Sequence, residues 1–65
     1  MHKYILEKDN FYIASAGFDA KGVLKLEVTA NPDEALSLHF KRTIVQLRRL
    51  IKKTIKIKFN IIKVW

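Results

Sequence analysis

The chain has 65 residues, no cysteine and a formal net charge of +7 at neutral pH. This length allows one domain, residues 1–65, with a small core and little room for a deep catalytic cleft beside it. The lack of cysteine excludes disulfides, thiolate zinc sites and a thiol nucleophile, and it is typical of a reducing, intracellular setting. No stretch has the apolar length of a signal peptide or of a membrane span, so the sequence predicts a cytoplasmic protein.

Charge divides the chain into two parts. Residues 1–35 carry four lysines against six acids, a net charge of −2, whereas residues 36–65 carry nine Lys and Arg and no acid. The stretch 41–58 alone holds eight of the thirteen basic residues. This segregation favours a polyanionic partner, either nucleic acid or a nucleoprotein, or else an acidic protein or an anionic membrane surface. A solvated basic face that only maintains solubility is the structural alternative.

The N-terminal residues predict a β-hairpin. Asp9-Asn10 tolerates positive φ and would form a two-residue turn between strands at 3–8 and 11–15. Lys8 would then pair with Phe11, Leu6 with Ile13, and Tyr4 with Ser15. Alternation places Tyr4, Leu6, Phe11 and Ile13 on the core face. The opposite face would carry Lys3, Ile5, Glu7, Tyr12 and Ala14.

A second turn and a third strand follow. Asp19 suits the start of a type I turn and Gly22 a left-handed position after it. Residues 23–29 alternate cleanly, and the side chains predicted to point inward are Leu24, Leu26 and Val28. Asn31-Pro32-Asp33-Glu34 predicts one short helical turn. Residues 36–40 are compatible with a short extended segment or with a simple crossing over the sheet.

The basic stretch predicts a helix over residues 41–53 with two unlike faces. Its apolar arc of about 120° contains Phe40, Ile44, Leu47, Leu50, Ile51 and Thr54. The opposite arc contains Lys41, Arg42, Arg48, Arg49, Lys52 and Lys53, with Val45 alone among them. No Glu stands one turn earlier to pair with any of these bases, and this unrelieved repulsion favours an external anion. Lys52 and Lys53 also interact well with the C-terminal end of the helix dipole.

Residues 55–61 predict a last strand, in which Ile55, Ile57 and Phe59 face the helix and Lys56 and Lys58 face away. The alternation fails at Ile61-Ile62. Either a bulge brings Ile62 and Val64 inward, or the end of the strand is apolar on both faces. Trp65 either caps the edge of the core or anchors a partner or a homodimer.

Together these elements predict an α+β domain with the order β-β-β-α-β, an antiparallel sheet with one helix packed on one face. On the open face, Tyr12 would stand among lysines that include Lys56 and Lys58, an arrangement found where single-stranded nucleic acid is bound. Planar guanidinium groups suit phosphate better than ammonium groups do, so the foremost candidate contacts on the helix are Arg42, Arg48 and Arg49.

No pattern in the sequence indicates an enzyme, a cofactor or a metal. His2 and His39 stand alone, and His39 is predicted to be a partly buried packing residue. The adjacent acids Asp33 and Glu34 are predicted to be helix-start charges, not an acid/base pair. The two glycines are turn residues and belong to no phosphate-binding loop.

Three segments, YILEKDNFYIASAGFD, GVLKLEVT and NPDEALSLHF, precede the predicted helix. In this arrangement the chain resembles short phage and prophage accessory proteins of Gram-positive bacteria over residues 3–40. The resemblance implies a compact phage protein in the cytoplasm of an infected or lysogenic host. It also implies a role as inhibitor of a host machine, an anti-CRISPR being one form. Those proteins tend to have a helix rich in Glu and Ala, whereas this helix is basic.

Three functional hypotheses follow. The first is a basic binding module that engages nucleic acid or a nucleoprotein effector through the Lys/Arg helix face. The second is a protein-protein inhibitor that binds an acidic host protein through the basic face and the apolar end 61–65. The third is a membrane-surface element formed by residues 41–65, which competes with folding because the same apolar arc is needed for the core.

Overall fold

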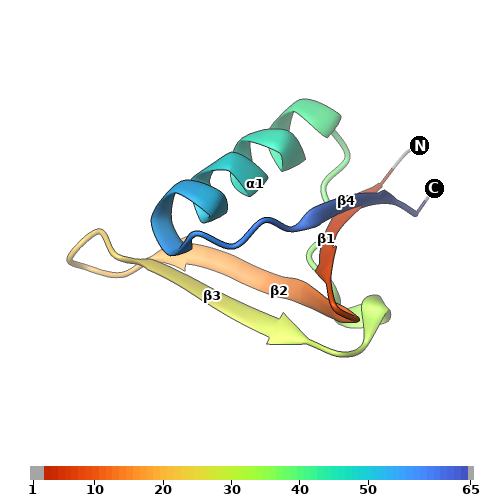
Figure 1. The fold of residues 1–65 in the computed structure, drawn as a ribbon, viewed down its shortest axis with the longest axis horizontal. Helices are drawn as coiled ribbons and strands as arrows, with labels where there is room; N and C mark the ends of the chain where they lie inside the picture. Colours follow the sequence, from red (N-terminus) through yellow and green to blue (C-terminus); the bar gives the residue numbers. More distant parts are fainter. Residues whose placement is uncertain (1–2, 65) are drawn as a thin grey trace.

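In a computed structural model that describes residues 3–64, one helix lies across one face of a four-stranded antiparallel sheet (Figure 1). The elements are β1 (Tyr4–Lys8), β2 (Phe11–Phe18), β3 (Leu24–Thr29), the 3-10 turn η1 (Pro32–Glu34), α1 (Lys41–Ile55) and β4 (Asn60–Lys63). The strand order across the sheet is β3-β2-β1-β4. The predicted α+β class and the order β-β-β-α-β are therefore confirmed, and so is the short helical turn at Pro32.

The β1–β2 turn is the two-residue turn that the sequence predicts. Asp9 and Asn10 have φ values of 52° and 68°, the left-handed pair that matches the twist of a hairpin. Lys8 lies opposite Phe11, as expected. The Asn10 N–H also donates a hydrogen bond of 3.1 Å to the Glu7 carboxylate, which stabilises the turn from the preceding strand.

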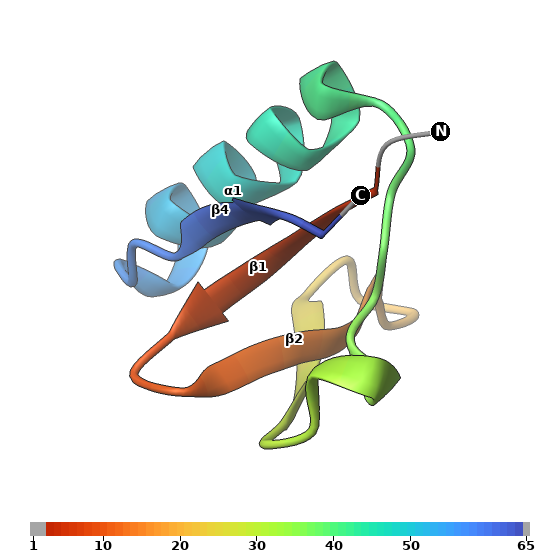
Figure 2. The same ribbon diagram turned by 90° about the vertical axis from the view of Figure 1, so that its right-hand side faces the viewer.

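Beyond this turn the hairpin opens, because the chain segment before the helix enters between β1 and β2. The Tyr4 N–H donates to the Leu38 carbonyl (2.9 Å) and the Leu38 N–H donates back to Tyr4 (3.0 Å), while the Leu36 N–H donates to the Ile13 carbonyl (2.8 Å). The predicted pairs of Leu6 with Ile13 and Tyr4 with Ser15 are therefore wrong. Figure 2 shows this green segment running from η1 to the start of α1.

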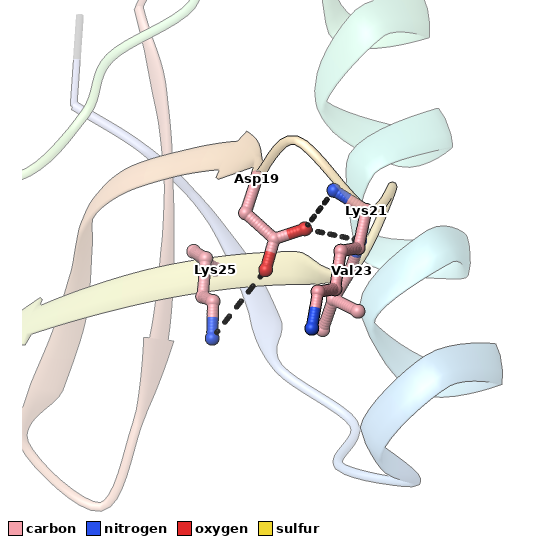
Figure 3. Close-up of polar contacts among 4 residues, drawn as sticks. All are labelled: Asp19, Lys21, Val23 and Lys25. Atoms are coloured by element: carbon pink, nitrogen blue, oxygen red, sulfur yellow. Dashed lines mark hydrogen bonds and ion pairs between the residues drawn. The ribbon is translucent and has the colours of Figure 1, made fainter.

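The β2–β3 turn depends on the Asp19 carboxylate (Figure 3). One oxygen of Asp19 accepts hydrogen bonds from the N–H groups of Lys21 (2.8 Å) and Val23 (2.9 Å), and the other lies 3.8 Å from the Lys25 ammonium. Gly22 has a φ of 78°, the left-handed position predicted for it. In β2 the register shifts between Ile13 and Ser15, so Ala14 is an extra residue in the ladder.

The core lies between α1 and the two strands that it contacts most, β1 and β4. Its buried members are Leu6, Ile13, Ile44, Ile51 and Phe59. Phe11 and Val28, both predicted to face the core, are 52% and 57% exposed. They lie on the correct face, but the helix covers β1 and β4 and leaves these positions of β2 and β3 open to solvent.

The far face of β1 is also partly covered. Ile5, predicted to point outward, is 3% exposed, and it lines a hollow together with Pro32 and Ala35, which follow β3 in the chain. Ile62 lies opposite Ile5 in an unbroken β1–β4 register, while Ile61 packs against the core. Of the two alternatives for Ile61-Ile62, the strand that is apolar on both faces is therefore the correct one.

Helix α1 extends two residues beyond its predicted end, to Ile55, which was predicted to begin the last strand. Lys56 adopts the left-handed conformation (φ 63°, ψ 25°), and its N–H donates to the Lys52 carbonyl (3.0 Å). Residues 56–59 then carry the chain back to the sheet edge, and the strand is confined to Asn60–Lys63. The predicted last strand is confirmed, but its predicted bounds of 55–61 are wrong, because the end of the helix and the connection to the sheet edge take up residues 55–59.

We expect Lys56→Gly to raise the free energy of unfolding by about 0.5–1 kcal/mol, because glycine adopts the left-handed conformation without a Cβ clash. Lys58→Gly is the matched control, since Lys58 does not have positive φ, and it should be neutral or destabilising. Urea unfolding followed by circular dichroism measures both variants. Equal effects of the two substitutions would contradict a specific role of the Lys56 backbone in ending the helix.

Candidate functional site

The eight bases of the stretch 41–58 form what we call the basic surface. Its members are Lys41, Arg42, Arg48, Arg49, Lys52, Lys53, Lys56 and Lys58. The first six belong to α1, and the last two lie in the connection that follows it. All are exposed except Arg48, which is half-buried. The predicted site residues therefore do come together, along the helix and around its C-terminal end.

The helix presents these bases in two rows. Arg42, Arg49 and Lys53 lie about 160° around the helix from the buried pair Ile44 and Ile51, so they point directly away from the sheet. The second row, Lys41, Arg48 and Lys52, lies only about 50–90° from that pair. This row flanks the core contact, which explains why Arg48 is half-buried. The outward row is the part of the surface that a large partner reaches without obstruction.

The apolar contact of the helix differs from the predicted arc. Val45, expected among the bases, packs against the core, whereas Phe40 is 74% exposed and Thr54 is also exposed. Phe40 has an extended backbone and precedes the helix, so the periodicity of a helix does not apply to it. Thr54 lies in the last turn, on the side away from Val45.

The basic surface has no internal charge compensation. The salt bridge found within residues 3–64 joins Lys25 and Asp19. No acid in this range lies within salt-bridge distance of any of the eight bases. Arg48 with Lys52 and Arg49 with Lys53 are like-charged neighbours one turn apart, an arrangement that destabilises a helix by a few tenths of a kcal/mol. The repulsion between neighbouring bases that the sequence predicts is therefore present in the structure, and no acid among residues 3–64 reduces it.

The N-terminal end of α1 adds to the positive potential. Phe40 makes no side-chain cap, and the first turn contains no acid. Instead Lys41 and Arg42 stand at the positive end of the helix dipole, where cations are unfavourable. Phe40 presents an exposed aromatic ring beside them. From the sequence this residue is predicted to face the core, so it was not included among the candidate binding residues. Its extended position before the first helical residue is the signal that could have separated it from the arc.

The predicted aromatic site on the open sheet face is not formed. Tyr12 is half-buried in β2, but Lys56 and Lys58, expected around it, belong to the helix end and the following connection. Tyr12 lies opposite Glu7 and Thr29 instead. The side chain of Trp65, the other predicted aromatic contact, lies outside the described residues, as does that of His2.

The remaining features of residues 3–64 are a hollow beside β1 and an exposed histidine. A hollow of about 330 Å³ on the far side of β1 is lined by one carboxylate and one ammonium, those of Asp33 and Lys3, beside apolar groups that include Val64. No group of three His, Asp or Glu side chains in this part of the chain could hold a metal ion. His39 is exposed, so its predicted partial burial is wrong. No helix in the described range is long and apolar enough to cross a membrane.

Comparisons with protein-family models, with curated protein sequences and with solved structures give no match. The resemblance to short phage proteins therefore stays a prediction. The most unusual property of the described surface is a set of eight positive charges on one helix and its C-terminal connection, with no acid among residues 3–64 within salt-bridge distance.

Proposed function

We propose that the chain is a non-enzymatic binding module that engages a polyanion, either nucleic acid or a nucleoprotein, through the basic surface. The observation that carries this proposal is that no acid among residues 3–64 lies within salt-bridge distance of the eight bases. A surface that serves only solubility would normally mix charges of both signs and avoid the repulsion. An external anion would relieve the repulsion along the helix and at its uncapped N-terminal end.

The dimensions and side chains of α1 suit such a partner. Its 15 residues extend about 22 Å, the axial length of about six base pairs. Arg42 and Arg49 are exposed on the outward row and can donate two parallel hydrogen bonds to a phosphate, while Lys53 supplies a point charge. Exposed Phe40 at one end of the surface offers a ring on which an unpaired base could stack.

The biological setting within this proposal comes from the resemblance to short phage proteins. A small basic module in the cytoplasm of an infected or lysogenic host would act as an inhibitor of a host nucleoprotein machine, an anti-CRISPR being one form. The helix face would bind the nucleic acid of that machine or compete with nucleic acid for its site.

A second candidate is an inhibitor that binds an acidic host protein through the basic surface and the apolar C-terminal end. Val64 favours it, because this side chain is 42% exposed at the margin of the hollow beside β1. If the chain binds an acidic protein in this way, removal of Val64 and Trp65 would weaken binding more than any single Arg substitution. The first candidate predicts the opposite ranking.

The test is a titration of the purified chain against labelled duplex DNA, single-stranded DNA and structured RNA, each at 50 and 200 mM salt. If about five phosphates are neutralised, the affinity for the preferred nucleic acid should fall about 10²–10³-fold between the two salt concentrations. Absence of binding to all three at the lower concentration would overturn direct nucleic-acid binding and favour the acidic-protein candidate.

A further inference from the structure

The strand β3 is an open edge of the sheet, and its backbone is neither shortened, nor bulged, nor interrupted by Pro; its exposed charges are those of Lys25 and Glu27, which have opposite signs. It is the outermost strand beside β2 (Figure 1), and it contains no Pro. The register shift of this hairpin lies in β2, at Ala14, and β3 itself runs without interruption. Natural edge strands are commonly shortened, bulged or interrupted by Pro, because unpaired N–H and C=O groups recruit another strand.

The hydrogen bonds of the β2–β3 turn show which amides face the open edge. The Asp19 N–H donates to the Val23 carbonyl (3.0 Å), so the backbone groups of Val23 point toward β2. Bonding direction alternates along an antiparallel strand, so Lys25 and Glu27 also bond toward β2. The N–H and C=O groups of Leu24, Leu26 and Val28 therefore point outward, to the open edge.

The side chains of β3 divide by the same alternation. The face on the helix side carries half-buried Leu24 and Leu26 and Val28, which is 57% exposed. It continues onto Phe18, which lies opposite Leu24 in β2 and is 61% exposed. The other face carries exposed Lys25 and Glu27. An edge with free amides thus borders an apolar patch on one face and two opposite charges on the other.

We propose that a second copy of the chain pairs with this edge, β3 antiparallel to β3, about a two-fold axis at Leu26. In this register Leu26 lies opposite Leu26 of the second copy, and Leu24 opposite Val28, so every outward amide meets a partner. On the other face Lys25 of each copy lies opposite Glu27 of the other. The pairing therefore forms two cross-strand ion pairs and one continuous apolar strip.

Charge selects this register over its neighbours. A shift by two residues in either direction keeps the outward amides paired but places Lys25 opposite Lys25, or Glu27 opposite Glu27, and like charges directly opposite are destabilising. A shift by one residue places Lys25 opposite an apolar residue, Leu26 in one direction and Val28 in the other. The other sheet edge, β4, is shorter, and its exposed Lys63 has no acid to oppose, since residues 36–65 contain none. Complementarity is specific to β3.

The symmetric pair closes on itself and leaves no further β3 edge open. Because the two-fold axis runs through the sheet, both copies of α1 lie on the same side of one eight-stranded sheet. Helix α1, which carries six of the eight bases, has its main strand contacts with β1 and β4, and these strands are separated from the paired edge by β2. The proposed pairing involves β3 alone and does not depend on what the basic surface binds.

Sedimentation of the full chain without nucleic acid, in about 0.3 M salt to screen the basic surfaces, tests the pairing. We expect a concentration-dependent dimer of twice the 7.6 kDa chain mass. Lys25→Glu and Glu27→Lys each place two like-charged pairs at the interface and should weaken dimerisation about tenfold or more. The double variant K25E/E27K restores opposite charges and should recover the wild-type dimer, an outcome that a folding defect in the single variants would not give.

Lys21→Glu is the matched control, because Lys21 is exposed in the turn outside β3 and the change in net charge equals that of K25E. Val28→Lys, which places a charge in the apolar strip, supplies a second disruptive variant if a charge variant fails to fold. A wild-type chain that stays monomeric up to millimolar concentration would overturn the proposal. Equal dimerisation of the wild type, K25E and E27K would overturn it as well.

Discussion

Replacing Ile51 with Ala should remove most of the folded population of this chain at 25 °C. Ile51 is 0% exposed and, within residues 3–64, belongs to a cluster of five buried side chains that it shares with Leu6, Ile13, Ile44 and Phe59. Truncating a fully buried isoleucine costs about 2–5 kcal/mol through lost burial and the cavity left behind. A core in a domain of this length rarely supplies more than about 3–5 kcal/mol in total, so a single truncation offsets most of the stability.

Urea unfolding monitored by circular dichroism measures this loss for Ile51→Ala against the wild type. Ile55→Ala is the matched control, because it makes the same substitution in the last turn of the same helix at a side chain that is 39% exposed. The control should lose less than about 1 kcal/mol, since little apolar surface is removed from the core. Similar losses for the two variants would contradict the placement of the core between α1 and the sheet.

Neutralising the outward row of the basic surface should have the largest effect on binding. The triple variant R42Q/R49Q/K53Q removes three exposed charges that point away from the sheet. Each phosphate contact contributes about 0.9 to the slope of log affinity against log salt. We therefore expect the slope to become shallower by about 2.7 and the affinity at low salt to fall about a hundredfold. Gln is a good helix former and relieves the repulsion, so the fold should persist.

The matched control for this triple variant is K3Q/K8Q/K21Q, which removes the same number of charges at exposed positions outside the helix. If binding depends on the helix face, the control should retain nearly the wild-type slope and affinity. Equal losses in the two triple variants would indicate that general positive charge attracts the nucleic acid, and would contradict a defined site on α1. Arg48 is left intact because it is half-buried, and its replacement would mix effects on binding with effects on stability.

Much of the candidate site could be predicted because charge is a property of the sequence itself. Six of the eight bases lie along the helix as expected, Lys56 and Lys58 lie after its end and not in the predicted strand, and no acid of the first 35 residues comes within salt-bridge distance of the eight. The face that the helix turns toward the sheet was predicted less accurately. Val45 packs against the core and Phe40 does not, because the contact depends on where the helix meets β1 and β4. Lys56 and Lys58 were predicted in the last strand, but they lie in the connection after the helix. The chain needs the residues of this connection to return from the helix to the edge of the sheet.

Features that depend on neighbouring residues follow from the amino-acid sequence alone. Asp9-Asn10 and Gly22 specify turns because few other residues accept positive φ. The helix begins at Lys41 as predicted, and the basic segment follows directly from composition. Contacts between residues far apart in the chain depend instead on the tertiary fold. Leu36 and Leu38 bond to Ile13 and Tyr4 in place of the predicted hairpin pairs. Their backbone donors and acceptors are the same at every residue, so nothing in the local sequence distinguishes one partner from another before the chain folds.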